Sequence, residues 1–371
     1  MPRVLLTQRQ IFAFALFICS GIAFLYFVLP NLAGVGTTVH RIERGEKWWI
    51  AVGVALEALS FAGYVVLFRS VFVRGRGRIG WRVSYEITMA GLVATRLFAA
   101  AGAGGVALTA WALRRSGMAP RMVASRMVAF MVLLYSIYAA SLLIDGVGLG
   151  SGLFPGGGSF AITIVPALVA TALVALTGAI ALLPGDAERR LSALSTRPGT
   201  DARGLWGRAA RWVVPIVAAP ALAASGVRTA ISLVRERDPG LLGAPAWWGF
   251  DMMVLWAMFH AFGSPPALTV IWMSYFVGTL GNLLPLPGGL GGVEGGMIGA
   301  FAAFGVNLDL SVLAVLSYRA ISFWLPTLPG GVAYFQLRRT VARWREEQRA
   351  LAPATQLAGV AADGAGALQG S

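Results

Sequence analysis

Long apolar segments that recur along the chain constrain its fold more than any other feature. A run of about 20 apolar residues crosses the roughly 30 Å hydrocarbon core of a bilayer as a helix, because lipid supplies no water to unpaired backbone groups. Runs of about this length lie near residues 11–30, 47–69, 122–145, 160–183, 212–234, 247–262, 267–284 and 311–335. Only 12% of the residues are charged, against about 25% in soluble proteins. The sequence therefore predicts an all-α, polytopic integral membrane protein.

Two further apolar segments, 86–112 and 285–305, are rich in glycine, and the second contains the stretch LPLPGGLGGVEGG. Proline and glycine both disfavour a continuous helix. Basic loops decide whether these segments cross, since arginine gathers on the cytoplasmic side. If 86–112 crossed, the arginines of 74–82 and of 114–121 would lie on opposite sides. We therefore expect about eight transmembrane helices, two re-entrant broken-helix segments, and both termini in the cytoplasm.

The same pattern divides the chain into parts. We expect one transmembrane domain over 1–345, with a first half near 10–183, a basic cytoplasmic loop at 184–211 and a second half near 212–345. Residues 346–371 have no periodic apolar face, and a disordered cytoplasmic tail is predicted there. The stretches GAGGVAL and GLGGVEG share the pattern G-x-G-G-V, one in each broken segment, which leaves an inverted repeat open. Broken helices at corresponding places in two halves point to a transporter site at the membrane midplane.

The remaining composition excludes several other classes of protein. A net charge of +14 would suggest a nucleic-acid partner in a soluble protein, but here the basic residues lie between apolar runs, as positive-inside loops do. One cysteine and two histidines argue against a metal centre, and no motif for a nucleotide or other cofactor occurs. The tryptophan pairs Trp48–Trp49 and Trp247–Trp248 are interpreted as interfacial belts at the ends of spans.

Glu294 and Arg319 are the two most informative charged residues. Pro285 and Pro287 precede a predicted helix start, which places Glu294 in the first turn of that helix. There the carboxylate either caps the helix or serves as a titratable group in a polar cavity, because acids within a membrane are costly. Arg319 lies too deep in the last span to reach the headgroup region easily, so we expect it to pair with Glu294 or with an anion.

Other polar residues within apolar segments complete the candidate site. Arg96 opens the first broken segment, where it either extends toward the cytoplasmic headgroups or binds a lipid phosphate. Glu57 lies near the middle of one span, and Asp251 and His260 share another, so a role in coupling to protons stays open. The predicted substrate-binding residues are Arg96, Gly102, Gly104, Gly105, Pro285, Pro287, Gly288, Gly289, Gly291, Glu294 and Arg319.

The stretches LPLPGGLGGVEGGMIGAFAAFGV and SYRAISFWLPTLPGGVAYFQLRR resemble the lysylphosphatidylglycerol synthase transmembrane region family. This family comprises the flippase half of the bacterial multiple peptide resistance factor and its stand-alone relatives. ATRLFAAAGAGGVALTAWALRRSGM matches the first broken segment of the family more loosely, and the resemblance covers about residues 10–345. It implies a polytopic fold with re-entrant helices and the movement of lipids. By position, 285–294 and Arg319 would form part of the path of the lipid headgroup.

The leading hypothesis is a flippase of the bacterial cytoplasmic (inner) membrane that moves a phospholipid, aminoacylated or otherwise modified in its headgroup, between leaflets. No soluble synthase domain accompanies the resemblance, so we do not expect an enzyme. The alternatives are a proton- or ion-coupled carrier of a small soluble solute and a non-transporting membrane partner subunit. Beyond the membrane and the phospholipid no partner is predicted, and a homodimer is left open.

Overall fold

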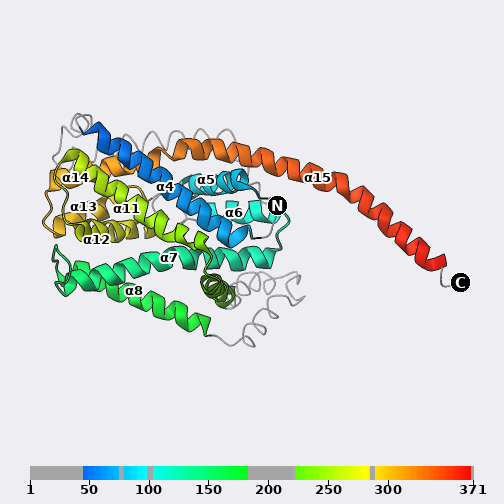
Figure 1. The fold of residues 1–371 in the computed structure, drawn as a ribbon, viewed down its shortest axis with the longest axis horizontal. Coiled ribbons are helices and arrows are strands. Elements are labelled where there is room, and N and C mark those ends of the chain that lie inside the picture. The colour runs from blue at the N-terminus through cyan, green and yellow to red at the C-terminus, as the bar shows by residue number, and fades with distance from the viewer. Residues whose placement is uncertain are drawn as a thin grey trace, which may run out of the picture.

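The computed structural model consists of helices joined by turns and loops over the residues that it describes, which are 45–74, 79–97, 103–182, 220, 222–284 and 289–368. Side chains are described within these ranges except at 97, 103 and 348–368. The long helices lie side by side in one bundle, and the last helix extends beyond it (Figure 1). The helices are α4 (Lys47–Phe72), α5 (Trp81–Leu97), α6 (Ala103–Arg115), α7 (Pro120–Gly150), α8 (Phe160–Ala181), α11 (Gly243–Phe262), α12 (Leu268–Thr279), α13 (Gly292–Ala303), α14 (Leu308–Arg319) and α15 (Thr327–Leu368), with short turns η3 (Pro239–Leu242), η4 (Leu280–Leu283) and η6 (Ala320–Trp324).

Most of the predicted spans coincide with helices. Helices α4, α7 and α8 and the continuous segment 308–347 are long and apolar enough to cross a membrane. Helix α11 covers the predicted span at 247–262, and α12 with η4 covers the one at 267–284. The first predicted span lies outside the described residues, and the span at 212–234 is described only from its helical part at 222 onward. These helices confirm the predicted all-α membrane fold.

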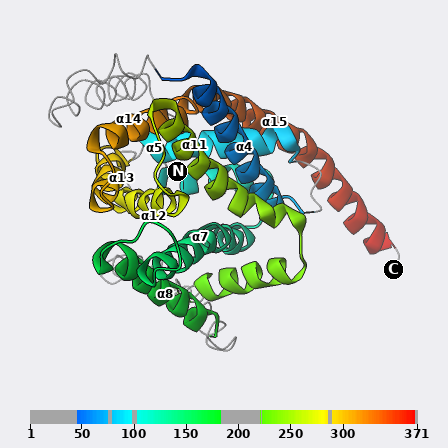
Figure 2. The ribbon, with the colours of Figure 1, turned by 60° about the vertical axis from the view of Figure 1, so that its left-hand side comes forward.

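Each glycine-rich segment contributes to a helical hairpin rather than to one long helix. Helix α5 packs against α6, and α12 packs against α13. The first hairpin lies toward one end of the long helices and the second toward the other end (Figures 1 and 2). This arrangement agrees with two segments that enter from opposite faces of a membrane.

Close packing within the hairpins depends on glycine. A Cβ atom at Gly105 would lie 2.6 Å from the carbonyl oxygen of Gly91, so α5 and α6 could not approach as they do. In the second hairpin, a Cβ atom at Gly296 would lie 3.0 Å from the carbonyl oxygen of Gly278. Small residues let helices in a membrane pack through their backbones. The glycines that interrupt the apolar pattern thus hold the hairpins closed.

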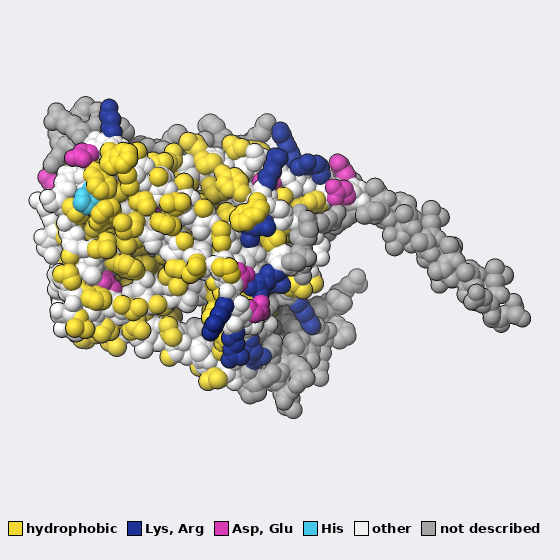
Figure 3. All heavy atoms as spheres, in the orientation of Figure 1, with side chains coloured by type: hydrophobic (Ala, Val, Ile, Leu, Met, Phe, Trp, Pro, Cys, Tyr) yellow, Lys and Arg dark blue, Asp and Glu magenta, His cyan; other side chains and the backbone are white. Residues whose placement is uncertain are grey.

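Basic residues gather at the end of the bundle that also contains the start of the first hairpin (Figure 3). There the Arg126 guanidinium at the start of α7 donates to the carbonyl oxygen of Phe72 at the end of α4, at 3.0 Å. Arg74 pairs with Glu236 and, at 2.6 Å, with Asp238. We call this end of the bundle the basic end. The loops before α5 and after α6 both lie at the basic end. A re-entrant segment begins and ends on the same side of the membrane, whereas a crossing segment would place these two loops at opposite ends of the bundle.

The order of packing repeats along the chain. Helix α4 is followed by the α5–α6 hairpin and α7, and α11 is followed by the α12–α13 hairpin and α14. Helices α4 and α11 pack along each other. Helix α7 packs against α12, and α15, which continues α14, packs against α5. These reciprocal contacts support the predicted relation between the two halves.

The last span is interrupted and then extended. A π-helical turn, η6, separates α14 from α15, and the backbone of α15 continues to Leu368. The helix therefore reaches into the segment for which we expected a disordered tail. Within the bundle, Thr340 of α15 donates a hydrogen bond to the buried carboxylate of Glu86 on α5, at 2.8 Å. This contact fixes α15 against the first hairpin.

Candidate functional site

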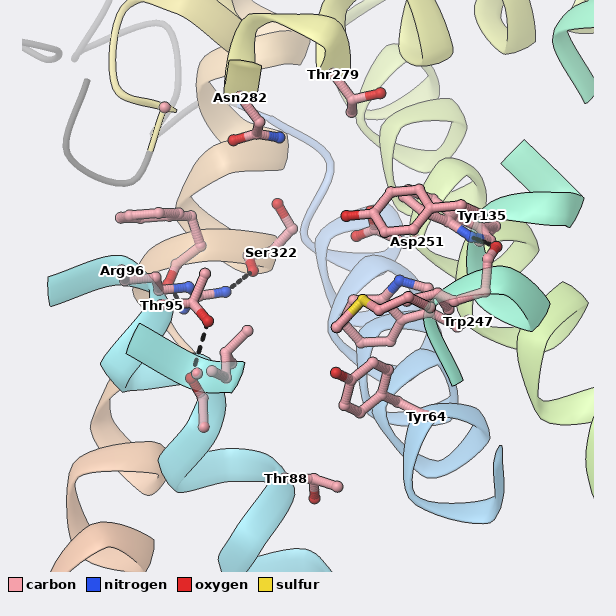
Figure 4. A pocket seen from close by; sticks show the side chains of 18 of the residues that line it. Tyr64, Thr88, Thr95, Arg96, Tyr135, Trp247, Asp251, Thr279, Asn282 and Ser322 are labelled. Carbon is pink, nitrogen blue, oxygen red and sulfur yellow. Dashed lines mark hydrogen bonds between the residues drawn. The ribbon is translucent and has the colours of Figure 1, made fainter. Parts of the chain in front are cut away.

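A cavity of about 480 Å³ lies within the bundle, between the two hairpins. Figure 4 shows part of its lining, with Arg96 and Ser322 on one wall and Tyr64, Trp247 and Asp251 on the facing wall. Both hairpins contribute, since Gly105 and Gly289 each line it. Its polar and charged lining consists of Glu57, Tyr64, Thr88, Thr95, Arg96, Thr109, Tyr135, Asp251, Tyr275, Thr279, Asn282, Tyr318, Arg319 and Ser322. A volume of this size is typical of sites for small molecules or headgroups.

Glu294 and Arg319 form a buried ion pair, one of the two pairings that the sequence leaves open for Arg319. The Arg319 Nε donates to Glu294 Oε1 at 2.6 Å, and both side chains are buried. The other carboxylate oxygen, Oε2, accepts from the backbone N–H of Gly291 at 2.7 Å and caps helix α13. Gly291 has a positive φ of 81°, which glycine adopts without strain. Glu294 therefore both caps a helix and holds Arg319, while only Arg319 lines the cavity.

Arg96 binds the broken backbone of the last span. Its Nη2 donates to the carbonyl oxygen of Ser322 at 2.8 Å, and its Nη1 donates to the carbonyl oxygen of Phe323 and, at 2.6 Å, to Thr327 Oγ1. In a regular helix the Ser322 carbonyl would accept from residue 326, but Pro326 has no N–H. Arg96 supplies the missing donors. It is buried, so of the two roles left open for Arg96 in the sequence, extension to the headgroup region does not fit the structure.

One aromatic ring lies beside both cavity arginines. The guanidinium carbon of Arg96 lies 4.5 Å from the centre of the Phe323 ring, and that of Arg319 lies 4.4 Å from it. A cation over an aromatic face is stabilised by the charge distribution of the ring. Phe323 belongs to the π-helical turn, and turns of this kind recur at functional sites. The irregular turn thus organises a positively charged wall.

The facing wall carries two acids. Glu57 on α4 and Asp251 on α11 are both buried and line the cavity, on two helices that pack along each other. Asp251 Oδ2 accepts from the hydroxyl groups of Tyr275 and, at 2.9 Å, Tyr318. The structure therefore brings together two candidates that the sequence could only place in separate spans.

The other predicted site residues are distributed as follows. Gly289 and Gly105 line the cavity, whereas Gly104 lies in the first turn of α6 and is absent from the lining. Gly102, Pro285, Pro287 and Gly288 lie outside the described residues. His260 stacks on Trp49, with ring centres 4.4 Å apart, at the C-terminal end of α11 and does not line the cavity. The structure does not place it beside Asp251.

Tryptophans and tyrosines of the cavity were missed in the sequence. Trp247 and Trp248 line the cavity, a role that their interpretation as an interfacial belt did not include. The Trp248 indole donates to the carbonyl oxygen of Leu134 on α7 at 2.8 Å. The pair lies within α11, which begins at Gly243, earlier than the apolar run suggests. The sequence around Tyr275 and Tyr318 does not mark them as site residues, because only the fold brings both hydroxyl groups to Asp251.

These features define a polytopic helical membrane protein with two helical hairpins and a central cavity of mixed charge. Its family follows from comparison with known proteins. The model of the family described as the lysylphosphatidylglycerol synthase TM region matches residues 10–330, and the chain belongs to this family. That finding confirms the resemblance seen in the sequence motifs.

Three curated relatives come from Methanothermobacter thermautotrophicus. All three are named UPF0104 membrane protein, and they are 40%, 33% and 35% identical over 110, 109 and 86 residues. The alignments cover 29%, 28% and 23% of this chain and 31%, 32% and 26% of the relatives. The matched parts thus span a third or less of those proteins, and their names identify no substrate.

Proposed function

We propose that this protein moves a phospholipid between the two leaflets of its membrane, with the headgroup in the central cavity and the acyl chains in the bilayer. The observation that carries the proposal is a cavity with charged walls whose lining includes exposed side chains at the surface of the bundle. Val106, Tyr135 and Leu283 line the cavity and are also 39%, 53% and 76% exposed. A mouth with apolar and tyrosine side chains would admit a lipid from the side.

Charge in the cavity suits a phosphate group. Arg96 and Arg319 lie on one wall, where the low dielectric constant of the interior strengthens their attraction for an anion. Both guanidinium groups already have protein partners, so they are held in place before a lipid arrives. The volume of about 480 Å³ would accommodate a headgroup, whereas two acyl chains would have to remain outside. Membership of a family defined by the transmembrane region of a lipid synthase supports the same function.

The test is lipid translocation in proteoliposomes that contain the purified protein and a labelled phospholipid. Met131 of α7 lines the cavity, and Met131→Trp would fill part of it. Leu143 on the same helix is 37% exposed and does not line the cavity, so Leu143→Trp is the matched control. We expect the first substitution to lower the translocation rate at least tenfold, on the order of the loss that a misplaced group causes in a shaped site. Equal rates in both variants would count against a headgroup path through the cavity.

A second candidate is a carrier of small soluble solutes, favoured by the polar residues that line the cavity from Thr88 to Asn282. Glycerophosphoethanolamine separates the two functions, because it has the headgroup chemistry of a lipid without the acyl chains. Uptake of this tracer without lipid translocation would favour the soluble carrier.

Orientation in the membrane belongs to the proposal too. Arg74 lies at the basic end, and Arg114, Arg115 and Arg121 lie at the junction of α6 and α7, which meets the same end. We therefore place this end in the cytoplasm, with both termini on that side of a bacterial inner membrane. Cysteine labelling from either side of intact cells tests this placement. Labelling of residues 79–80 and 116–119 from opposite sides would contradict it.

A further inference from the structure

The carboxyl groups of Glu57 and Asp251 form the unusual feature of the cavity. They lie on α4 and α11, which pack along each other, and the two residues are 4% and 9% exposed. Both carboxyl groups line the same cavity, where each is exposed to the charge of the other. Two negative charges side by side in a medium of low dielectric constant are costly, so one of the two carboxyl groups keeps its proton. The pair therefore holds one proton and one negative charge inside the bundle.

The surroundings show which carboxyl carries the proton. Asp251 accepts from two phenol hydroxyl groups, those of Tyr275 and Tyr318, and hydrogen bonds of this kind stabilise the charged form of an acid. Glu57 has the opposite environment, because its Oε2 is buried and has no hydrogen-bond partner within the described part of the chain. The negative charge thus rests on Asp251 and the exchangeable proton on Glu57.

The groups that face the pair come from every neighbouring element. Those that line the cavity with the pair and have a charge or a titratable proton are Tyr64 on α4, Arg96 on α5, Tyr135 on α7, Tyr275 on α12, and Tyr318 and Arg319 on α14. The α13 carboxylate, Glu294, is held by Arg319. Arg96 is held by the backbone of the last span. If Glu57 lost its proton, two negative charges would touch in a medium of low dielectric constant, so a mobile cation would have to replace the proton.

The wall around the pair suits an organic cation. Tyr64 and Trp247 lie on the same side of the cavity as Asp251, opposite Arg96 (Figure 4). Aromatic faces attract ammonium groups, most strongly where water is excluded. A headgroup with a phosphate and an ammonium group would meet an opposite charge on each wall.

We propose that the Glu57–Asp251 pair exchanges its proton for the ammonium group of a lipid headgroup, so that the lipid and the proton move in opposite directions. The inference rests on the proposed lipid transport and names its substrate class and coupling. The proton leaves the Glu57 carboxyl for water in the cavity, and the ammonium N–H groups then donate to both carboxylates. No covalent bond to the lipid forms or breaks.

The transport experiment compares labelled phosphatidylethanolamine with phosphatidylglycerol of the same acyl chains, in proteoliposomes with a pH gradient of about one unit. For one proton per lipid, such a gradient can shift the leaflet ratio by up to about tenfold. We expect phosphatidylethanolamine to accumulate in the leaflet on the acidic side and phosphatidylglycerol to ignore the gradient. Glu57→Gln keeps a donor for Asp251 but lacks the exchangeable proton, so it should abolish the response.

Asp145 provides the matched control. It is a buried acid of α7 that does not line the cavity, so Asp145→Asn removes a buried carboxyl without touching the pair. The gradient response of this variant should equal that of the wild type. Translocation of phosphatidylethanolamine that ignores the gradient, or a full response in Glu57→Gln, would overturn the exchange and leave lipid transport standing. If neither phosphatidylethanolamine nor phosphatidylglycerol is translocated, both proposals are overturned.

Infrared spectroscopy of the purified protein tests the proton site without transport. The carbonyl stretch of a protonated carboxyl should be present in the wild type, absent in Glu57→Gln and retained in Asp145→Asn. Addition of phosphatidylethanolamine should reduce this band, whereas phosphatidylglycerol should not. A spectrum in which no such band depends on Glu57 would overturn the assignment of the proton, whatever the vesicles show.

Discussion

The ion pair between Glu294 and Arg319 allows a quantitative test of how the second hairpin is held. The Nε to Oε1 distance is 2.6 Å, and the side chains are 0% and 8% exposed. Removing one partner of such a buried pair leaves an unpaired charge and costs about 3–5 kcal/mol. Glu294→Gln keeps an oxygen that can accept from the Gly291 N–H, so the helix cap is preserved and the charge is the main loss. Arg319→Met keeps an unbranched apolar side chain and removes the other charge.

The double variant should be much less unstable than the sum of the single variants, because no unpaired charge remains in it. We expect a coupling energy of about 3 kcal/mol, a factor on the order of 100 in the unfolding equilibrium. Unfolding can be followed by tryptophan fluorescence while a denaturing detergent is titrated into protein in mild micelles. If the stability losses of the two single variants add to that of the double variant within about 0.5 kcal/mol, the two residues act independently and the buried pair does not hold the hairpin.

The ion pair at the basic end is the natural control for this cycle. Arg74 and Asp238 lie 2.6 Å apart, but their side chains are 28% and 24% exposed. Water and salt screen such a pair, and exposed pairs contribute about 0.2–1 kcal/mol. The cycle of Arg74→Met and Asp238→Asn should therefore give a coupling energy well below that of the buried pair. A similar value for both pairs would mean that burial is not the source of the difference.

Three further predictions concern stability, each measured in the same titration. Arg96→Gln should cost about 1–3 kcal/mol by leaving buried carbonyl groups without donors, and Pro326→Ala, which restores an N–H, should recover part of that loss. Gly296→Val should open the second hairpin and destabilise the protein, whereas valine at the preceding glycine, where a Cβ meets no atom within 4 Å, should be tolerated. The pKa of Asp238 is lowered by its hydrogen bond from Arg74. The contribution of Asp238 to stability is therefore present above the unfolded pKa of about 3.9 and is lost as the pH falls through the folded pKa. Asp238→Asn should be less stable than the wild type at pH 7 but not near pH 2.

The fold could be predicted from the sequence where two independent signals agreed. Apolar length predicted the spans, and the arginine-rich loops showed that 86–112 returns to the side from which it enters. The Glu294–Arg319 pair was within reach for a similar reason: each charge lies deep in an apolar segment, and a buried charge needs a partner. Both signals can be read without knowing the fold, because the membrane interior requires apolar side chains and paired charges in any segment that enters it.

Contacts between distant segments could not be predicted in this way. Glu57 and Asp251 lie in different halves of the chain, and nothing in either span indicates that α4 and α11 pack along each other. Two of the acceptors for Arg96 are backbone carbonyl groups, of which the Ser322 carbonyl lacks its helical donor because residue 326 is proline, so no side chain in the sequence indicates them. Trp247 and Trp248 were assigned to an interface because the apolar run begins near them, whereas helix α11 begins at Gly243.

The two walls of the cavity differ in what they can offer a ligand. The guanidinium groups of Arg96 and Arg319 are tied to the backbone and to Glu294, so they act on a phosphate mainly through their charge. A charge attracts every phospholipid that carries a phosphate, and it cannot distinguish one headgroup from another. In the proposed exchange the acids on the facing wall can, because only a headgroup with a cation would replace the proton of the Glu57–Asp251 pair. Selectivity should therefore follow substitutions at Glu57 more closely than substitutions at either arginine, which should weaken the transport of all lipids alike.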